Sequence, residues 1–201
     1  VTLSGDVTLD LSLGGFVTAC SVDAQVWDAT TTALPLTASD TATTVALPFT
    51  VTRNGSPRTT AYVSSNGVVN FLGLETSFAN TGIPNAAAPN DAIYGFWDHL
   101  KLDGSSAVLA NTFGTAPNRR FVIEYPNVGI FDDPSPRVSF QIVLYEDPNQ
   151  RIRLQYKGNT AGTLSAGTSA TGGHENAAGT SAQQGSFNKG LLFDGLSVRP
   201  K

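Results

Sequence analysis

Hydrophobic and polar residues alternate along the first part of the chain, which is typical of a β-strand with one face buried away from solvent. The apolar positions of this segment are Val7, Leu9, Leu11 and Leu13, and polar residues stand between them. Gly14 and Gly15 then interrupt the pattern. A strand with an exposed apolar face is an aggregation hazard, so something must cover it. We expect the cover to be the chain's own sheet or a neighbouring subunit that accepts the strand.

The same period of two recurs along the rest of the chain. It is clearest at 59–64, 120–125, 138–145 and 151–156. Turn-forming sequences separate these segments, among them Asn54-Gly55, Ser65-Asn66-Gly67 and Asp147-Pro148-Asn149. Helical periodicity is missing. Short strands at this spacing predict an all-β protein built as an antiparallel, jelly-roll-like β-sandwich.

One predicted hairpin, 138–156, offers a candidate binding surface. The returning strand has polar residues at 151, 153 and 155, so we expect one of its faces to be wet. Tyr145 and Tyr156 are expected near each other across the hairpin, flanked by Arg151 and Arg153. An amphipathic, arginine-fringed face of this kind suits binding. The alternative is an outer face that is simply solvated.

The remaining segments suggest a division of the chain. The apolar run 92–97 is expected to cross the core, and 80–91 forms a long polar loop before it. The Ser/Thr/Ala-rich stretch 21–44 is expected to be irregular chain with short strands. We therefore predict an N-terminal strand at 1–15, which either ends a preceding repeat or is donated to a neighbour, and a sandwich domain at 16–201.

Charge and hydropathy exclude several classes of function. The 201 residues carry a net charge of −4, so the chain lacks the basic field that nucleic-acid binding needs. No apolar run approaches the roughly 18 to 20 residues of a membrane helix. Low charge and plentiful small polar residues suit a β-rich protein.

Cross-links are limited by the residue types available. Cys20 is the single cysteine, which excludes an internal disulfide and a cysteine-based zinc site. It is expected to be a buried thiol or to pair with a cysteine outside this sequence. An isopeptide bond from Lys101, Lys157 or Lys189 stays open, because sequence supplies no geometry for it.

The histidines do not complete a catalytic motif. His174-Glu175 begins like the zinc motif His-Glu-x-x-His, but Ala178 occupies the position of the second ligand. The segment 167–171 lacks the second glycine of a nucleophile elbow. We therefore predict that the chain is not an enzyme.

Asp98 is the candidate metal ligand. It follows Trp97 near the end of a predicted strand, and hard oxygen ligands such as its carboxylate suit calcium. The alternative is a buried carboxylate that accepts hydrogen bonds from loop backbone and braces the Trp97 corner. Calcium is thus the one cofactor that the sequence suggests.

A series of short motifs resembles a known family. It comprises Leu-Pro-Phe at 47–49, Ala-Tyr-Val-Ser-Ser-Asn-Gly at 61–67, Gly-Phe-Trp-Asp-His-Leu at 95–100 and the segment 114–125. Their order resembles a β-sandwich module of secreted bacterial multidomain proteins, found beside subtilisin-like peptidases or carboxypeptidase-regulatory-like repeats. The module is distantly similar to the extracellular domain of nidogens, and the resemblance covers about residues 40–200. His99 and His174 depart from its pattern, where acidic and aliphatic residues would be commoner.

The resemblance implies an extracellular or cell-surface location and a non-catalytic role. The leading hypothesis is an accessory or adhesion module that binds a polymer or protein surface. The competing hypothesis is a structural subunit of an extracellular fibre, in which copies of the chain join through the strand that carries Val7, Leu9, Leu11 and Leu13.

Overall fold

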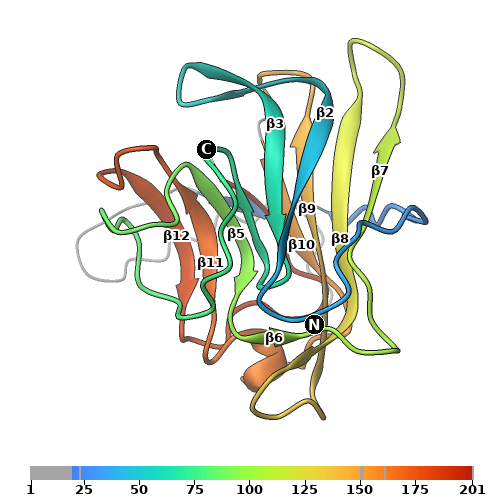
Figure 1. The fold of residues 1–201 in the computed structure, drawn as a ribbon, viewed down its shortest axis with the longest axis vertical. Coiled ribbons are helices and arrows are strands. Elements are labelled where there is room, and N and C mark those ends of the chain that lie inside the picture. Colours follow the sequence, from blue (N-terminus) through green and yellow to red (C-terminus); the bar gives the residue numbers. More distant parts are fainter. Residues whose placement is uncertain (1–19, 23, 150–151, 161, 201) are drawn as a thin grey trace.

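A computed structural model describes residues 20–22, 24–149, 152–160 and 162–200. In this part of the chain, thirteen strands form two antiparallel sheets that face each other (Figure 1). The prediction of an all-β antiparallel sandwich is confirmed. The described ranges contain no helix that is long and apolar enough to span a membrane.

The first sheet has six strands in the order β12-β11-β5-β4-β3-β2. Along the chain these are β2 (Ala42–Arg53), β3 (Ser56–Ser64), β4 (Val68–Asn70), β5 (Ala92–Trp97), β11 (Thr171–Glu175) and β12 (Ala182–Phe187). The predicted turn at Asn54-Gly55 joins β2 to β3, and both of its residues have positive φ, as a tight hairpin turn requires.

The second sheet has seven described strands in the order β1-β13-β10-β9-β8-β6, with β7 also paired to β8. They are β1 (Cys20–Val22), β6 (Leu100–Lys101), β7 (Leu109–Phe113), β8 (Arg120–Ile130), β9 (Arg137–Tyr145), β10 (Ile152–Tyr156) and β13 (Ser197–Pro200). A 3-10 turn, η1 (Leu164–Ala166), lies between β10 and β11.

Aromatic side chains fill the centre of the sandwich. The Phe140 ring lies 4.4 Å from Tyr125 and 5.9 Å from Phe96, measured between centroids. Two buried tyrosines also tie the sheets together: the Tyr125 hydroxyl donates to the Ser64 carbonyl, and the Tyr156 hydroxyl donates to the Gly95 carbonyl. Alternate residues of β9 supply this core, as their period of two predicts.

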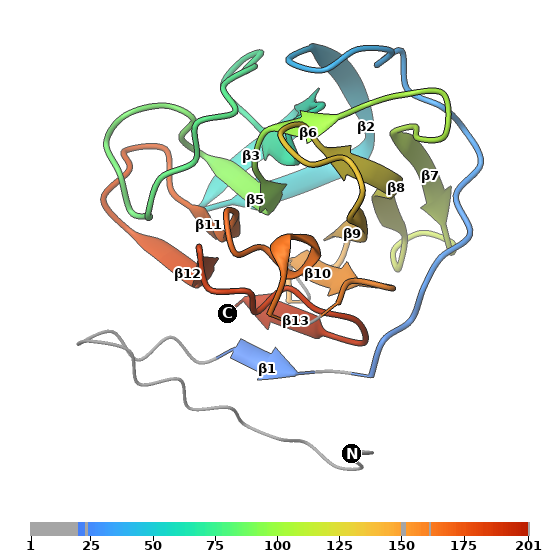
Figure 2. The same cartoon turned by 90° about the horizontal axis from the view of Figure 1, so that it is seen from below.

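The segment 24–32 crosses the outer face of the seven-stranded sheet, and Figure 2 shows it running along that side from β1 past β7. Polar side chains of the sheet hold its backbone. The Gln141 amide donates to the Asp28 carbonyl over 2.6 Å, and the Gln155 amide donates to the Val26 carbonyl over 2.7 Å. Sequence predicted short strands here, but residues 24–41 contain only an isolated bridge at Ala33.

This covering segment corrects the prediction of a wet hairpin face. Gln155 is fully buried and Arg153 is only 7% exposed. Amide side chains can be buried when they form hydrogen bonds, and carbonyls of 24–32 accept from the amide groups of Gln141 and Gln155. A polar residue at alternate positions of this strand therefore shows that the position faces outward, but it does not show that the side chain is exposed to solvent.

Candidate functional site

Aromatic rings from three separate loops stack at one end of the sandwich. Phe78 comes from the β4–β5 loop, His99 lies between β5 and β6, and Phe131 directly follows β8. The His99 ring lies 4.0 Å from each phenylalanine ring, nearly parallel to both. Phe78 is 44% exposed and Phe131 45%. We call these three residues the aromatic ledge.

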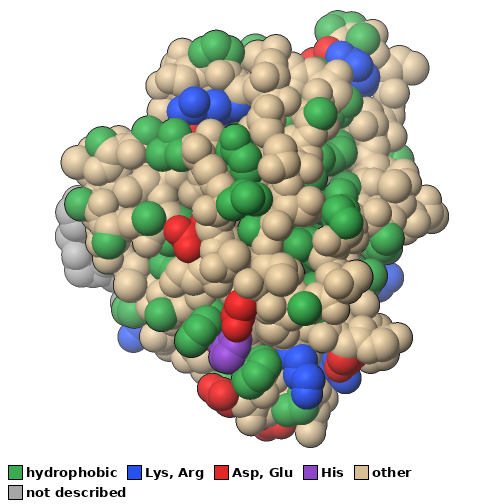
Figure 3. Space-filling view, in the orientation of Figure 1, with side chains coloured by type: hydrophobic (Ala, Val, Ile, Leu, Met, Phe, Trp, Pro, Cys, Tyr) green, Lys and Arg blue, Asp and Glu red, His purple; other side chains and the backbone are tan. Residues whose placement is uncertain are grey.

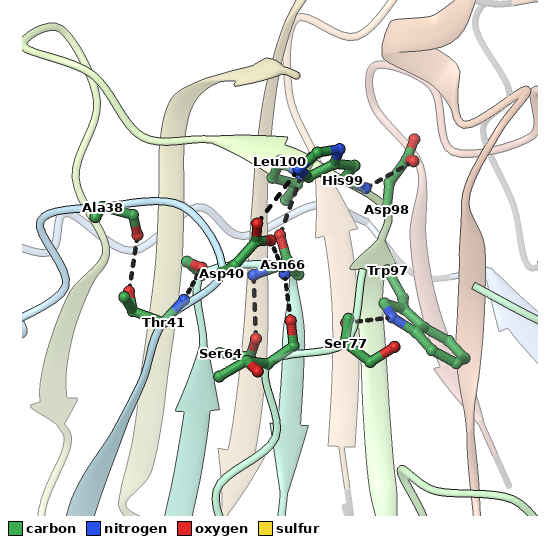
Figure 4. Close-up of polar contacts among 12 residues, drawn as sticks. Ala38, Asp40, Thr41, Ser64, Asn66, Ser77, Trp97, Asp98, His99 and Leu100 are labelled. Atoms are coloured by element: carbon green, nitrogen blue, oxygen red, sulfur yellow. Dashed lines mark hydrogen bonds and ion pairs between the residues drawn. The ribbon is translucent and has the colours of Figure 1, made fainter. Parts of the chain in front are cut away.

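Asn66 fixes the segments that carry Phe78 and His99, and Figure 4 shows its contacts near His99. It is fully buried in the turn between β3 and β4. Its side-chain amide donates to Asp40 Oδ1 and to the Thr76 carbonyl, each over 2.9 Å, and its side-chain oxygen accepts from the Leu100 N–H over 3.2 Å. One side chain thus ties the loop before β2, the β4–β5 loop and the start of β6 together.

Acidic groups surround the ledge. Asp40 Oδ2 lies 3.5 Å from His99 Nε2, and Asp40 is 41% exposed. Asp132 and Asp133 follow Phe131 and are exposed. Figure 3 shows a histidine near the lower end of this face, with hydrophobic and acidic side chains around it and Lys or Arg side chains close by. The ledge is therefore an apolar, aromatic surface with charges of both signs at its margin, and its exposed rings suit apolar contact or contact with a cationic side chain.

Asp98 lies beside the ledge but faces protein groups. Its Oδ1 accepts from the His99 N–H over 2.8 Å, and its Oδ2 accepts from Ser169 Oγ over 2.5 Å. Among the described residues, no group of three or more His, Cys, Asp or Glu side chains is placed to hold a metal. This geometry corresponds to the bracing role, while calcium binding stays a prediction.

The same contacts bear on catalysis. Ser169 donates straight to the Asp98 carboxylate, whereas in a Ser/His/Asp triad a histidine stands between the two. His174, the other histidine, contacts the side chain of Gln183 over 3.2 Å. The described residues therefore do not assemble a triad around Asp98.

Burial raises the pKa of the Asp98 carboxyl, and the hydrogen bonds from Ser169 and His99 only partly oppose this. A raised pKa means that the protonated form suits the folded state. Asp98 therefore adds stability below its ordinary pKa, and this contribution is lost as pH rises through the higher, folded pKa.

Asp98→Asn imitates the protonated carboxyl, so its effect on the stability of the folded protein should be more favourable at pH 7 than at pH 4. We expect the melting temperature of the variant, relative to the unmodified chain, to be higher at pH 7 than at pH 4 by about 2–4 °C, the effect of about 1 kcal/mol in a domain of this size. Calorimetry of both proteins at the two pH values measures this. An equal difference at both would contradict it.

The predicted binding surface on the hairpin is only partly assembled. Tyr145 and Arg153 do meet, since the Arg153 guanidinium lies 5.9 Å from the Tyr145 ring centroid and Arg199 lies 5.5 Å from it. The expectation for Tyr156 is wrong: it pairs with Phe140 and is fully buried in the core, far along the hairpin from Tyr145. Arg151 lies outside the described residues.

The predicted assembly strand, with Val7, Leu9, Leu11 and Leu13, also lies outside the described residues, as does the whole of 1–15. Fibre formation through this strand stays a prediction. Cys20 lies in β1 at an edge of the seven-stranded sheet, opposite Pro200.

The ledge was not predicted from the sequence. Phe78, His99 and Phe131 lie far apart along the chain, and each is an ordinary residue in its own segment. The only local signal was the turn 65–67, which correctly places Asn66 between two strands.

Comparison with known proteins agrees with this architecture. Residues 19–190 match the model of the NIDO-related family. The chain belongs to the NIDO-related family. No curated protein and no solved structure matches it. The NIDO-related match supports a distant relationship to nidogens and a module of non-catalytic type. It also begins before residue 40, where the resemblance of the motifs began, and so includes the segment 24–32 that covers the sheet.

Proposed function

We propose that this NIDO-related chain is a non-catalytic extracellular adhesion module that binds a polymer or protein surface through the aromatic ledge. The observation that carries the proposal is the stack of Phe78, His99 and Phe131, whose outer rings are each nearly half exposed. Exposed aromatic groups on a rigid support are typical of binding sites.

Rigidity supports the same proposal. The loops of the ledge are held by the buried side chain of Asn66 and by the indole of Trp97, which donates to the Ser77 carbonyl over 2.9 Å. Phe78 directly follows Ser77. A surface that is already ordered loses less conformational entropy on binding than a mobile loop does.

The test is binding of the purified chain to arrays of extracellular proteins, glycans and cell-wall polymers. We expect Phe78→Ser together with Phe131→Ser to weaken binding to the best array ligand about tenfold or more, because truncating central aromatic contacts costs about 2 kcal/mol or more.

Val26→Ser together with Phe193→Ser is the matched control. These side chains are also exposed, at 52% and 37%, but neither belongs to the ledge. The control should bind as the unmodified chain does. If the ledge variant kept full affinity, or if both variants lost it equally, the ledge would not be the binding surface.

A further inference from the structure

The segment 24–34, which we call the strap, runs along the outer side of the seven-stranded sheet (Figure 2) and is held there mainly by hydrogen bonds. Two of these bonds come from the sheet glutamines described above. In addition, the buried Glu124 carboxylate of β8 accepts from the Trp27 indole N–H over 3.3 Å and from the Thr30 hydroxyl. The strap is therefore attached by specific polar contacts, which form again wherever the same groups meet.

The strap itself adds little to the hydrophobic core. Among residues 24–34 only Asp28 is buried, and its carboxylate pairs with Arg120 of β8. When the strap lifts, water can solvate the amides and the carboxylate that it uncovers, so an open state is accessible. The open state also leaves the partly buried Trp27 side chain uncovered, which favours docking of the strap again.

The chain turns sharply where the strap ends. The Leu36 N–H donates to the Leu34 carbonyl over 2.7 Å, which closes a tight turn of the γ type around Pro35. Pro35 is exposed, whereas Leu36 is buried in the core. Opening this turn swings the strap away from its own sheet and leaves the core from Leu36 onwards in place. Short hinges of this kind invite the exchange of an element between copies of a chain.

We propose that the outer face of the seven-stranded sheet accepts the strap of a second copy of this chain, so that two copies exchange straps and form a dimer. The structure shows the fit of this occupant, because the exchanged segment is identical to the one already seated there. Glu124, Gln141 and Gln155 of one copy then bind the strap of the other. Only the turn around Pro35 differs between the two forms, so protein concentration determines which form is populated.

The exchange does not depend on the proposed function, but it would strengthen binding through the ledge. Phe78, His99 and Phe131 lie outside the strap, so each copy keeps a complete ledge. A dimer therefore presents two ledges. A polymer with repeating units can occupy both at once, which raises the overall affinity without any new contact.

An engineered disulfide distinguishes strap exchange from ordinary association. Ala33 of the strap lies opposite Leu109 of β7 in an antiparallel bridge. Opposite residues of this kind have Cα atoms about 4.5–5.5 Å apart, which a disulfide can span. The test protein is the full chain with Ala33→Cys and Leu109→Cys, and with Cys20→Ser to remove the natural thiol. Its disulfide lies within one chain in the closed form and joins two chains in the exchanged dimer.

The reduced protein is opened in mild urea at high concentration, returned to native buffer, oxidised and separated on a denaturing gel without reductant. We expect a covalent dimer. Its fraction should rise about tenfold for a tenfold rise in protein concentration while the dimer is the minor form. Protein that is oxidised before the urea step is the matched control. Its strap is locked to its own sheet, so it should stay monomeric in size-exclusion chromatography.

A hinge variant tests the turn separately. Insertion of Gly-Ser-Gly after Pro35 lengthens the turn and favours the closed form, so it should lower the dimer fraction severalfold. Three results would overturn the proposal: a monomer at every concentration, a dimer whose chains carry only internal disulfides, or an equal dimer fraction in the protein that was locked first. The second of these would mean that the copies associate through another surface.

Discussion

Replacing Gly67 with alanine is expected to lower the free energy of unfolding by about 3–5 kcal/mol, through left-handed backbone strain and overpacking together. Gly67 has φ +77°, and a methyl group there would collide with the carbonyl oxygen of Phe96. The Gly67 carbonyl also accepts from the Gly95 N–H over 3.0 Å, so the residue cannot move away without breaking the contact between turn and strand. Urea unfolding followed by tryptophan fluorescence measures the loss.

Gly55→Ala is the matched control for this prediction. Gly55 has a similar φ of +80° but has no atom within 4 Å of the added methyl group. It should lose only the cost of the left-handed conformation, about 1–2 kcal/mol. Equal losses at the two positions would mean that the Phe96 backbone yields to the new side chain, contrary to the prediction.

Asp91→Asn should destabilise the protein by about 3–5 kcal/mol, because it leaves buried charges uncompensated. Asp91 is 1% exposed and pairs with Arg53 and Arg58. Asparagine tolerates the positive φ of +47° at this position, so the substitution removes the charge with little backbone strain. Thermal and urea unfolding measure the change.

Asp103→Asn provides the comparison on the surface. The carboxylate of Asp103 pairs with Arg137 over 2.9 Å, but both side chains are about a third exposed. An exposed ion pair contributes about 0–1 kcal/mol, so this variant should be nearly as stable as the unmodified chain. Comparable losses in the two variants would refute the special role of the buried Asp91 cluster.

The alternating pattern predicted the strands well because it is a local property of the chain. The strand 138–145, with its inward-facing Val138, Phe140, Ile142 and Leu144, lies within β9 as expected. The apolar run 92–97 is β5, and all of its residues are buried. In both cases each side chain's position follows from the two-residue period of the backbone.

The segment that covers a sheet face lies far from that face in the sequence, so local patterns could not predict it. Gln141 and Gln155 are indistinguishable by type from solvated residues, yet both are buried beneath a segment more than 100 residues earlier in the chain. Tyr156 was misplaced for a related reason. It was expected near Tyr145 on a binding surface, but a carbonyl of the opposite sheet accepts its hydrogen bond inside the core.

The candidate site was harder to predict than the strands, because it forms where segments that are distant in sequence meet. The ledge needs the ends of β5 and β8 and the loop before β5 to meet. Motif 61–67 did contain the residue that organises the ledge. No spacing rule assigns Asn66 its three partners, since they come from separate parts of the chain.

The pairing of β1 with β13 determines how the module responds to mechanical load. These strands are antiparallel, with Cys20 opposite Pro200, so the first and last described residues lie side by side at one end of this strand pair. A force that separates these two points acts across the strands. It opens their hydrogen bonds one after another, as in unzipping, and does not shear them all at once. Tension transmitted through residues 20 and 200 would therefore detach the short β1 first. The aromatic ledge lies away from this pair of strands, in the part of the sandwich that such a load reaches later.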